Sequence, residues 1–301
     1  MILLKNGTFI DWQTLEFKQT NILVEEGPKG KIHFAFDPEQ TGITKKIDCT
    51  GKFITKSFAC GHHHVYSALA RGMGAPRKNP NNFQEILQYI WWTLDKSLDM
   101  DMIRFSALAT AIACAKNGVT FVIDHHASPF AVKGSLELIA QAFDEVGVGH
   151  LLCYEITDRD GLNFAKRGLN ETAGYLRYKQ GLVGLHASFT VGKDTLKQAV
   201  ALARETQSGI HVHVAEDKSD QTHCRSHYRK RVIERFANAG VLDFPKTILG
   251  HCLHLDENEK SIIANSPVWV VQNTESNLNN QVGNFNSIGL GKNIMMGTDG
   301  M

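Results

Sequence analysis

Eight short apolar runs along this chain each end in a polar residue that is capable of chemistry, and this pattern limits the fold more than any other feature. In chain order the endings are residues 62–64, 124–126, Glu155, His186, 213–216, His251, Asn273 and Asp299. From the second ending to the fifth, the spacing is about 27 to 31 residues, the length of one strand plus one helix. Strands that alternate with helices form a parallel sheet. Polar residues at the C-terminal ends of eight such strands predict an α/β fold, a (β/α)8 TIM-type barrel.

Residues 1–55 follow a different pattern from residues 56–301. Short alternating runs such as TNILVEEG are broken by Gly, Asn and Pro, which predicts an antiparallel β unit without helices. After residue 56 we expect strands and helices to alternate, with Asp99 as a helix N-cap. Helices are expected within residues 81–118 and at 134–146, 160–179, 193–207, 225–239 and 256–264. The sequence stops two residues after Asp299, so we expect a C-terminally truncated barrel without its last helix.

The composition excludes several classes of partner. The chain has 301 residues, 43% of them hydrophobic and 21% charged, with a formal net charge of +1 and no block of like charges. This balance argues against nucleic acid as a partner. No apolar run approaches the roughly 18 residues that cross a membrane, and we see no signal peptide. The six cysteines include no Cys-x-x-Cys pair, which favours a reduced, cytoplasmic protein.

The first candidate metal ligands stand in the run GHHH. Side chains along a strand alternate between its two faces, so His62 and His64 point together into the barrel mouth and His63 points away. Two imidazoles on one face have the spacing that one zinc ion needs. The alternative is a chance cluster in a chain with 14 histidines. Candidate ligands at other strand ends argue against chance.

Two further ligands come from later strands. His211 and His213 repeat the same spacing, and we choose His213 because it lies nearer the C-terminal rim of its strand. His211 fits a hydrogen-bonded core position better. Asp299 ends an apolar strand, where a lone carboxylate is costly unless it is paired or bound to a metal. We expect Asp299 to be the fourth ligand and a proton acceptor.

Other polar residues near the strand ends suit roles around the metal. Glu216 lies just past its strand, where a carboxylate can reach both water and substrate, although a solvated loop position is the alternative. His251 has no histidine two residues on, so it suits orienting water better than ligation. One residue of 124–126 is expected to line the pocket, and the alternative is a hydrogen-bonded strand end without a role in the pocket. Trp91 and Trp92 fit a helix core better than a pocket wall.

With these residues in place, the chain resembles the amidohydrolase superfamily. The resemblance is to the branch of cytosine, guanine and S-adenosylhomocysteine deaminases and triazine chlorohydrolases, and it is strongest to the SsnA-type aminohydrolases. It covers nearly the whole chain and is carried by GHHHVYSALARG, GVTFVIDHHASP, LLCYEITDRDG, HVHVAED, LGHCLHLD, NTESNLNNQVG and MMGTDG. It implies a barrel joined to a small β-sandwich that both chain ends build, and a homodimer at full length.

The resemblance also implies roles for individual residues. The metal ligands of the family match His62, His64, His213 and Asp299. Its proton-shuttling glutamate matches Glu216, and its water-contacting histidine matches His251. The residues that we expect to contact the substrate are His186, Asn273, Ser276, Asn277 and His126.

The expected function is metal-dependent hydrolysis of carbon–nitrogen bonds other than peptide bonds. The substrate implied is an aminated heterocycle such as a purine or pyrimidine, deaminated by water. Relatives with two metals bridge them with a carboxylated Lys or a Glu after the fourth barrel strand, where this chain has His186, so we expect a single divalent ion. Zinc suits three His and one Asp, with iron as the alternative. The alternative functions are a cyclic amide hydrolase, a chlorohydrolase, or an inactive metal-binding fragment.

Overall fold

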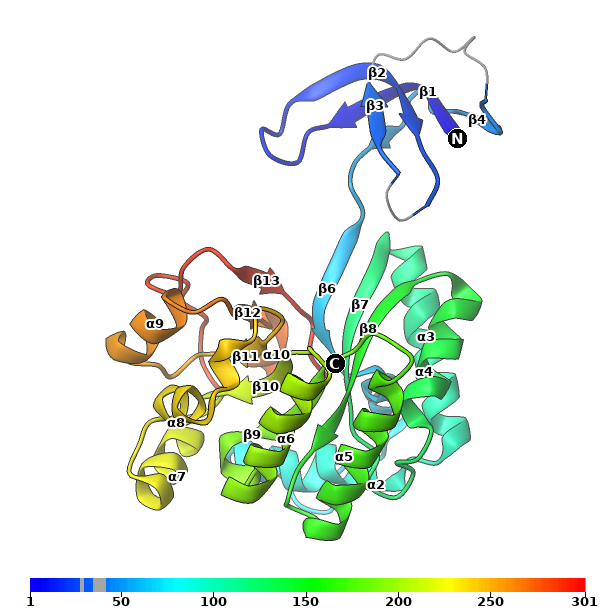
Figure 1. Ribbon diagram of the computed structural model, residues 1–301. Helices are drawn as coiled ribbons and strands as arrows, with labels where there is room; N and C mark the ends of the chain where they lie inside the picture. Colours follow the sequence, from blue (N-terminus) through cyan, green and yellow to red (C-terminus); the bar gives the residue numbers. More distant parts are fainter. Residues whose placement is uncertain (28–29, 35–41, 301) are drawn as a thin grey trace. The chain divides into compact units, whose positions relative to one another are not determined.

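The computed structural model describes residues 1–27, 30–34 and 42–300 (Figure 1). The chain divides into two compact units, Met1–Ser57 and Phe58–Met301, and each is described by itself. Within the described residues, no helix is both long enough and apolar enough to cross a membrane.

The first unit is a small sheet without helices among its described residues. Its strands are β1 (Ile2–Ile10), β2 (Phe17–Val24), β3 (Ile32–Phe34), β4 (Lys45–Asp48) and β5 (Phe53–Ile54). The order is β3-β2-β1-β4, with β5 also on β1. β1, β2 and β3 pair antiparallel, as expected, but β4 and β5 run parallel to β1, so the unit is mixed and the antiparallel prediction was wrong there. The second layer of a sandwich stays a prediction.

The second unit contains the eight parallel strands that the sequence predicted. They are β6 (Phe58–His63), β7 (Val119–His126), β8 (Gly149–Ile156), β9 (Val183–Ala187), β10 (Ile210–Val214), β11 (Ile248–His251), β12 (Trp269–Gln272) and β13 (Ile294–Met296). They pair in sequence order from β6 to β13. A single parallel bridge between His63 and Asp299 joins the two ends, and the backbone N–H of Asp299 donates to the carbonyl of His62 over 3.1 Å. The sheet is therefore a nearly closed TIM-type barrel.

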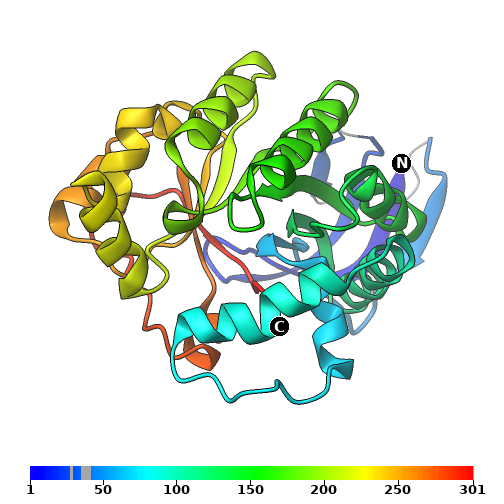
Figure 2. The same ribbon diagram turned by 90° about the horizontal axis from the view of Figure 1, so that it is seen from below.

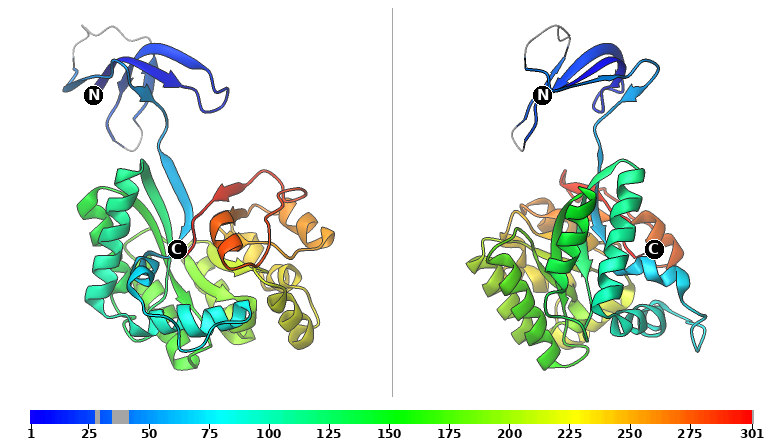
Figure 3. Two further views of the ribbon diagram at one scale, coloured as in Figure 1. Left: turned by 180° about the vertical axis from the view of Figure 1, so that it is seen from behind. Right: turned by 90° about the vertical axis from the view of Figure 1, so that its right-hand side faces the viewer.

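Helices lie outside the strands, as Figures 2 and 3 show. After β7 the longer helices are α4 (Ser135–Val146), α5 (Leu162–Leu176), α6 (Lys193–Glu205), α7 (Lys218–Tyr228), α8 (Val232–Ala239), α9 (Glu257–Ala264) and α10 (Thr274–Asn279). The single helix expected at 225–239 is two helices, because Arg229 takes a left-handed conformation with φ of 57° and ends α7.

A longer excursion separates β6 from β7. It comprises η1 (Val65–Gly72), α1 (Phe83–Ile86), the π-helical turn η2 (Leu87–Trp91), α2 (Trp92–Ser97) and α3 (Met100–Lys116). Asp99 caps α3, as predicted, because its side chain accepts from the backbone N–H of Met102 over 2.8 Å. In Figure 2 the cyan segment that holds α2 lies beside the C-terminal end of the chain.

Two apolar cores hold the barrel together. The larger core lies between strands and helices and includes Phe143 of α4, whose side chain is completely buried. The smaller core gathers Ile123, Cys153 and Val271 from β7, β8 and β12, together with Leu182 just before β9, so these residues meet inside the barrel. The packed interior leaves the polar strand ends as the place for chemistry.

Replacing Phe143 by Ala is expected to destabilise the protein by about 3 to 5 kcal/mol, because the truncation leaves a cavity in a packed core. Urea unfolding of the purified variant measures the loss. The matched control is Phe105→Ala in α3, where the ring is 59% exposed and the expected cost is under about 0.5 kcal/mol. Equal losses for the two variants would contradict this assignment of the core.

Candidate metal centre

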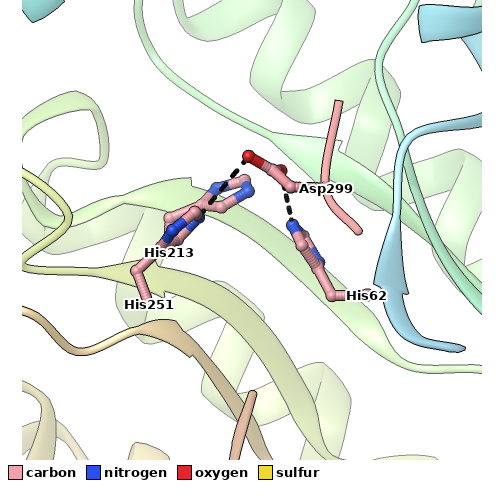
Figure 4. A group of neighbouring side chains, drawn as sticks. All are labelled: His62, His213, His251 and Asp299. Carbon is pink, nitrogen blue, oxygen red and sulfur yellow. Dashed lines mark hydrogen bonds and ion pairs between the residues drawn. The ribbon is translucent and has the colours of Figure 1, made fainter. Parts of the chain in front are cut away.

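Four histidines and one aspartate meet at the C-terminal ends of the barrel strands. His62 and His64 come from the end of β6, His213 from β10 and His251 from β11, and Asp299 follows β13. All five are buried. Figure 4 shows His62, His213, His251 and Asp299 directed toward one another. One possible ligand atom from each of these four lies within 4.8 Å of those of the other three.

Asp299 is the centre of the group. Its Oδ1 lies 2.9 Å from Nε2 of His62 and 3.0 Å from Nε2 of His64. Its Oδ2 lies 3.9 Å from Nε2 of His251. Nε2 of His64 is also 3.2 Å from Nε2 of His213. The predicted ligands His62, His64, His213 and Asp299 are therefore brought together, with His251 beside them.

The opposite nitrogen of each histidine is held by a partner farther out. Nδ1 of His62 lies 2.9 Å from Nε2 of His211, and Nδ1 of His251 lies 2.8 Å from Oδ1 of Asn277. Backbone carbonyls hold the other two: Nδ1 of His64 is 2.5 Å from the carbonyl of His125, and Nδ1 of His213 is 2.7 Å from that of His186. With a metal ion in the site, a proton on each Nδ1 would leave each Nε2 with a free electron pair for the ion. Such outer partners fix the tautomer and ring orientation of metal-ligating histidines.

Local backbone geometry explains why the side chains converge. His63 lies between the two ligand candidates, and its Nδ1 is 2.9 Å from Oγ1 of Thr298, away from the cluster. The strand alternation that the sequence predicted for the run GHHH is therefore confirmed. His251 and Asp299 both take left-handed conformations, with φ of 66° and 59°. Such conformations are uncommon outside glycine and occur where a site requires them.

The electrostatics of the cluster favour a cation. Burial alone would raise the pKa of Asp299, but hydrogen bonds from His62 and His64 hold it well below its usual value. Burial opposes protonation of His64, yet Asp299 and other nearby carboxylates raise its pKa to about 9. Burial lowers the pKa of His62 to about 3, against the pull of Asp299. One proton on His64 thus neutralises Asp299, and a divalent ion would displace it.

The residues present fit a metal ion by the chemistry of their donor atoms. Imidazole nitrogens with one carboxylate oxygen suit zinc, whose structural and catalytic sites use these ligands at about 2.0 to 2.2 Å. The structure thus supplies the His/Asp cluster that the expected divalent metal requires. A second group, Glu155 with His186 and His213, shares His213 and lies next to Arg159, whose positive charge disfavours another cation there.

Comparison with known proteins places the chain among related enzymes. The family model described as "Amidohydrolase family" matches residues 53–301. The chain belongs to the amidohydrolase family. A 5-methylthioadenosine/S-adenosylhomocysteine deaminase of Desulforudis audaxviator is 26% identical over 290 residues, which cover 92% of this amidohydrolase chain and 63% of the relative. The chain thus spans less than two thirds of that protein's length.

Two solved structures share the fold of this amidohydrolase. A zinc-bound adenosine deaminase from Xanthomonas campestris superposes with a TM-score of 0.83 at 18% identity, over 99% of this chain and 69% of that one. An atrazine chlorohydrolase from Arthrobacter aurescens, also with zinc, has a TM-score of 0.83 at 18% identity, over 99% and 72%. At this identity the likeness establishes the barrel fold.

A pocket opens beside the metal cluster of the amidohydrolase chain. It encloses about 450 Å³ of empty space, part of it open to solvent. The lining includes His64, His213, Glu216 and Asp299 on the side of the cluster. Glu216 follows β10, and its Oε2 lies 3.6 Å from Nε2 of His251. Burial and the nearby Asp299 raise the pKa of Glu216 well above its usual value, so this carboxyl can hold a proton.

The residues expected to contact substrate fall into two groups. His186 lines the pocket, with its Nδ1 held 2.6 Å from Oγ1 of Thr190. The other four are buried away from the lining. Ser276 donates to Oδ2 of Asp299 over 2.6 Å, Asn277 holds His251, and Nδ2 of Asn273 is 3.4 Å from Nε2 of His251. His126 pairs with Ser128 over 2.9 Å. The substrate roles of these residues stay predictions.

Sequence reasoning missed several pocket residues. Glu155 is the penultimate residue of β8 and was noticed only as a polar strand end, and Arg159 lies in the loop that follows. Trp91 and Trp92 pack against apolar neighbours, as expected of a helix core, but they also line the pocket. Strand-end position could have indicated Glu155. A pocket wall was the less favoured of two interpretations for the tryptophans, because the paths of η2 and α2 depend on tertiary contacts.

Proposed function

We propose that this protein hydrolytically deaminates an aminated heterocycle, such as a purine or pyrimidine, at a single metal ion held by His62, His64, His213 and Asp299. The observation that carries the proposal is the convergence of imidazole Nε2 atoms on Asp299, with every opposite Nδ1 held from outside. The family and the relative named as a deaminase support it.

A divalent ion held by these residues would lower the pKa of a water toward 7 and so supply a nucleophile at neutral pH. Asp299 accepts the proton of that water, with Oδ2 oriented by the hydroxyl of Ser276 over 2.6 Å. His251 keeps its Nε2 toward the same place because Asn277 holds its Nδ1. These two side chains therefore orient the attacking oxygen.

Glu216 moves protons on the substrate side. It delivers a proton to a ring nitrogen while the water oxygen bonds to the amine-bearing ring carbon. The proton that Asp299 took from the water joins the amine as the carbon–nitrogen bond breaks and ammonia departs. The second proton of the water returns to Glu216 as the carbonyl forms on the ring. The buried position of Glu216 beside His251 suits this general acid–base role.

The pocket supports a flat substrate. Apolar side chains also line the pocket, namely Phe83, Leu87, Trp91 and Trp92. Aromatic side chains favour stacking with planar rings. His186 lines the same pocket and is neutral, since burial lowers its pKa to about 4. A neutral imidazole there offers one nitrogen to a polar substituent of the ring.

A chlorohydrolase is the second candidate, because a zinc-containing atrazine chlorohydrolase shares the barrel. The same residues would then expel chloride instead of ammonia. Cyclic amide hydrolysis would open a ring without releasing ammonia or chloride. An inactive metal-binding fragment would form no product. Small-molecule substrate and water are the proposed partners. The predicted homodimer, the absence of a nucleic-acid partner and the cytoplasmic location stay predictions.

Ammonia release from a panel of aminated purines, pyrimidines and triazines tests the proposal. The zinc-loaded protein is expected to release ammonia from at least one of them, with kcat/KM of about 10⁴ M⁻¹s⁻¹ or higher, the low end for natural enzymes. Chloride release from chlorotriazines runs in parallel. Chloride without ammonia would select the chlorohydrolase, and zinc binding without any product would overturn both proposals.

A further inference from the structure

Helix α2 carries a buried carboxylate that reaches across to the barrel. The side chain of Asp95 is 1% exposed and pairs with Nη2 of Arg159, in the loop after β8. The same guanidinium binds Oε1 of Glu155 over 3.0 Å through Nη1 and Oδ2 of Asp160 over 3.2 Å through Nε. Arg159 therefore joins carboxylates from α2, from β8 and from the loop that follows β8.

Burial makes this contact different from an ordinary surface ion pair. The Arg159 side chain is 7% exposed, and those of Glu155 and Asp160 are 3% and 8% exposed. Exposed pairs contribute little, but a buried charge whose partner is removed is strongly unfavourable. A second pair, Lys96 with Asp160 at 2.7 Å, joins the same helix to the same loop but is more exposed.

The pairing determines the position of one wall of the pocket. The guanidinium carbon of Arg159 lies 4.9 Å from the centre of the Trp92 ring, and that ring is 6.0 Å from the ring of His186. Trp92, Arg159 and His186 all line the pocket, whereas Asp95 lies behind them and is not part of the lining. Asp95 thus contacts the lining residue Arg159 without facing the pocket itself.

Helix α2 depends on such anchors. It has six residues and follows the π-helical turn η2, within a long excursion between β6 and α3. Helices this short are not stable by themselves. Segments with few buried contacts open locally unless tertiary contacts close them. The contacts with the barrel therefore decide where α2 and its tryptophan lie.

We propose that Asp95 is a positioning residue, which through Arg159 holds α2 against the barrel and keeps Trp92 in place as a wall of the pocket. Its effect on substrate binding rests on the proposed function, whereas its effect on α2 does not. In Asp95→Ala, Arg159 keeps Glu155 and Asp160 as partners, so the barrel is expected to fold.

Hydrogen exchange followed by mass spectrometry tests the structural half directly. In Asp95→Ala, amides of residues 83–98 are expected to exchange about tenfold faster or more, because α2 opens more often. Asp95→Asn still accepts a hydrogen bond from Arg159 and should show about a threefold rise. Two controls should stay within about twofold. Lys96→Met removes a partly exposed lysine while Asp160 keeps Arg159, and Arg104→Met removes an exposed pair. Unchanged exchange at 83–98 in Asp95→Ala, or an equal rise along the whole chain, would overturn the proposal.

Kinetics test the other half with the substrate found by the ammonia screen. Asp95→Ala is expected to raise KM about tenfold with kcat within about threefold, and to keep one zinc per chain, since Asp95 is neither a metal ligand nor part of the pocket lining. Asp95→Asn should restore most of the affinity. A fall in kcat without a change in KM, or loss of zinc, would contradict a positioning role. If no heterocycle is deaminated, the proposed function fails, and hydrogen exchange still decides the role of Asp95.

Discussion

Alanine at His62 or at His64 is expected to strip the protein of zinc, whereas alanine at His63 between them is expected to leave zinc bound. The side chains of His62 and His64 meet at Oδ1 of Asp299, and that of His63 turns to Thr298. Losing even an outer partner of a ligand costs about 10- to 100-fold in metal affinity, so losing a ligand should cost more. Mass spectrometry of dialysed protein should show about one zinc per chain falling below about 0.1 in the two ligand variants.

His251→Ala decides between two ligand sets. The predicted set contains His64, but the compact group drawn in Figure 4 contains His251 in its place. Nε2 of His64 is 3.0 Å from Asp299, against 3.9 Å for Nε2 of His251, which favours His64 as the ligand. We therefore expect His251→Ala to keep zinc and lose turnover. If His251→Ala loses zinc and His64→Ala keeps it, His251 is the metal ligand and His64 is the residue beside it.

The barrel and the convergence of the His/Asp cluster could be predicted from the sequence, because both follow from short-range regularities. A strand–helix repeat of nearly constant length places every strand end on one rim, and alternation along β6 separates His63 from its neighbours. Neither inference needs knowledge of loop paths. The approach of His213 to His64 then follows from closure of the barrel.

The features that the sequence did not reveal depend on long-range contacts. Asp95 and Arg159 are 64 positions apart and no periodic pattern links them. The parallel pairing of β4 with β1 required a crossover that turn signals do not encode. Asn277 and Ser276 of α10 were expected at the substrate, which stays a prediction, and their hydrogen bonds to His251 and Asp299 were not foreseen. Residue type alone cannot distinguish contact with the substrate from support of its neighbour.

Glu216→Gln is expected to lower kcat about 10²- to 10⁴-fold while zinc stays at about one per chain, because the amide keeps the shape of the side chain but cannot carry a proton. Ala215, with φ of 44°, turns the chain after β10, so that Glu216 reaches the pocket next to His251. Steady-state deamination with the substrate from the screen measures kcat, and the zinc content is measured on the same sample.

The two readouts together identify the role of Glu216. A ligand role predicts loss of zinc along with activity, and a solvated loop position predicts no change in either. Only proton transfer predicts the loss of turnover at constant zinc, since Oε2 of Glu216 lies 3.6 Å from Nε2 of His251 and lines the pocket without joining the compact ligand group. Glu257→Gln, at a side chain that is 85% exposed, is the matched control and should leave kcat within about twofold. A kcat near the wild-type value in Glu216→Gln would show that another residue transfers the proton.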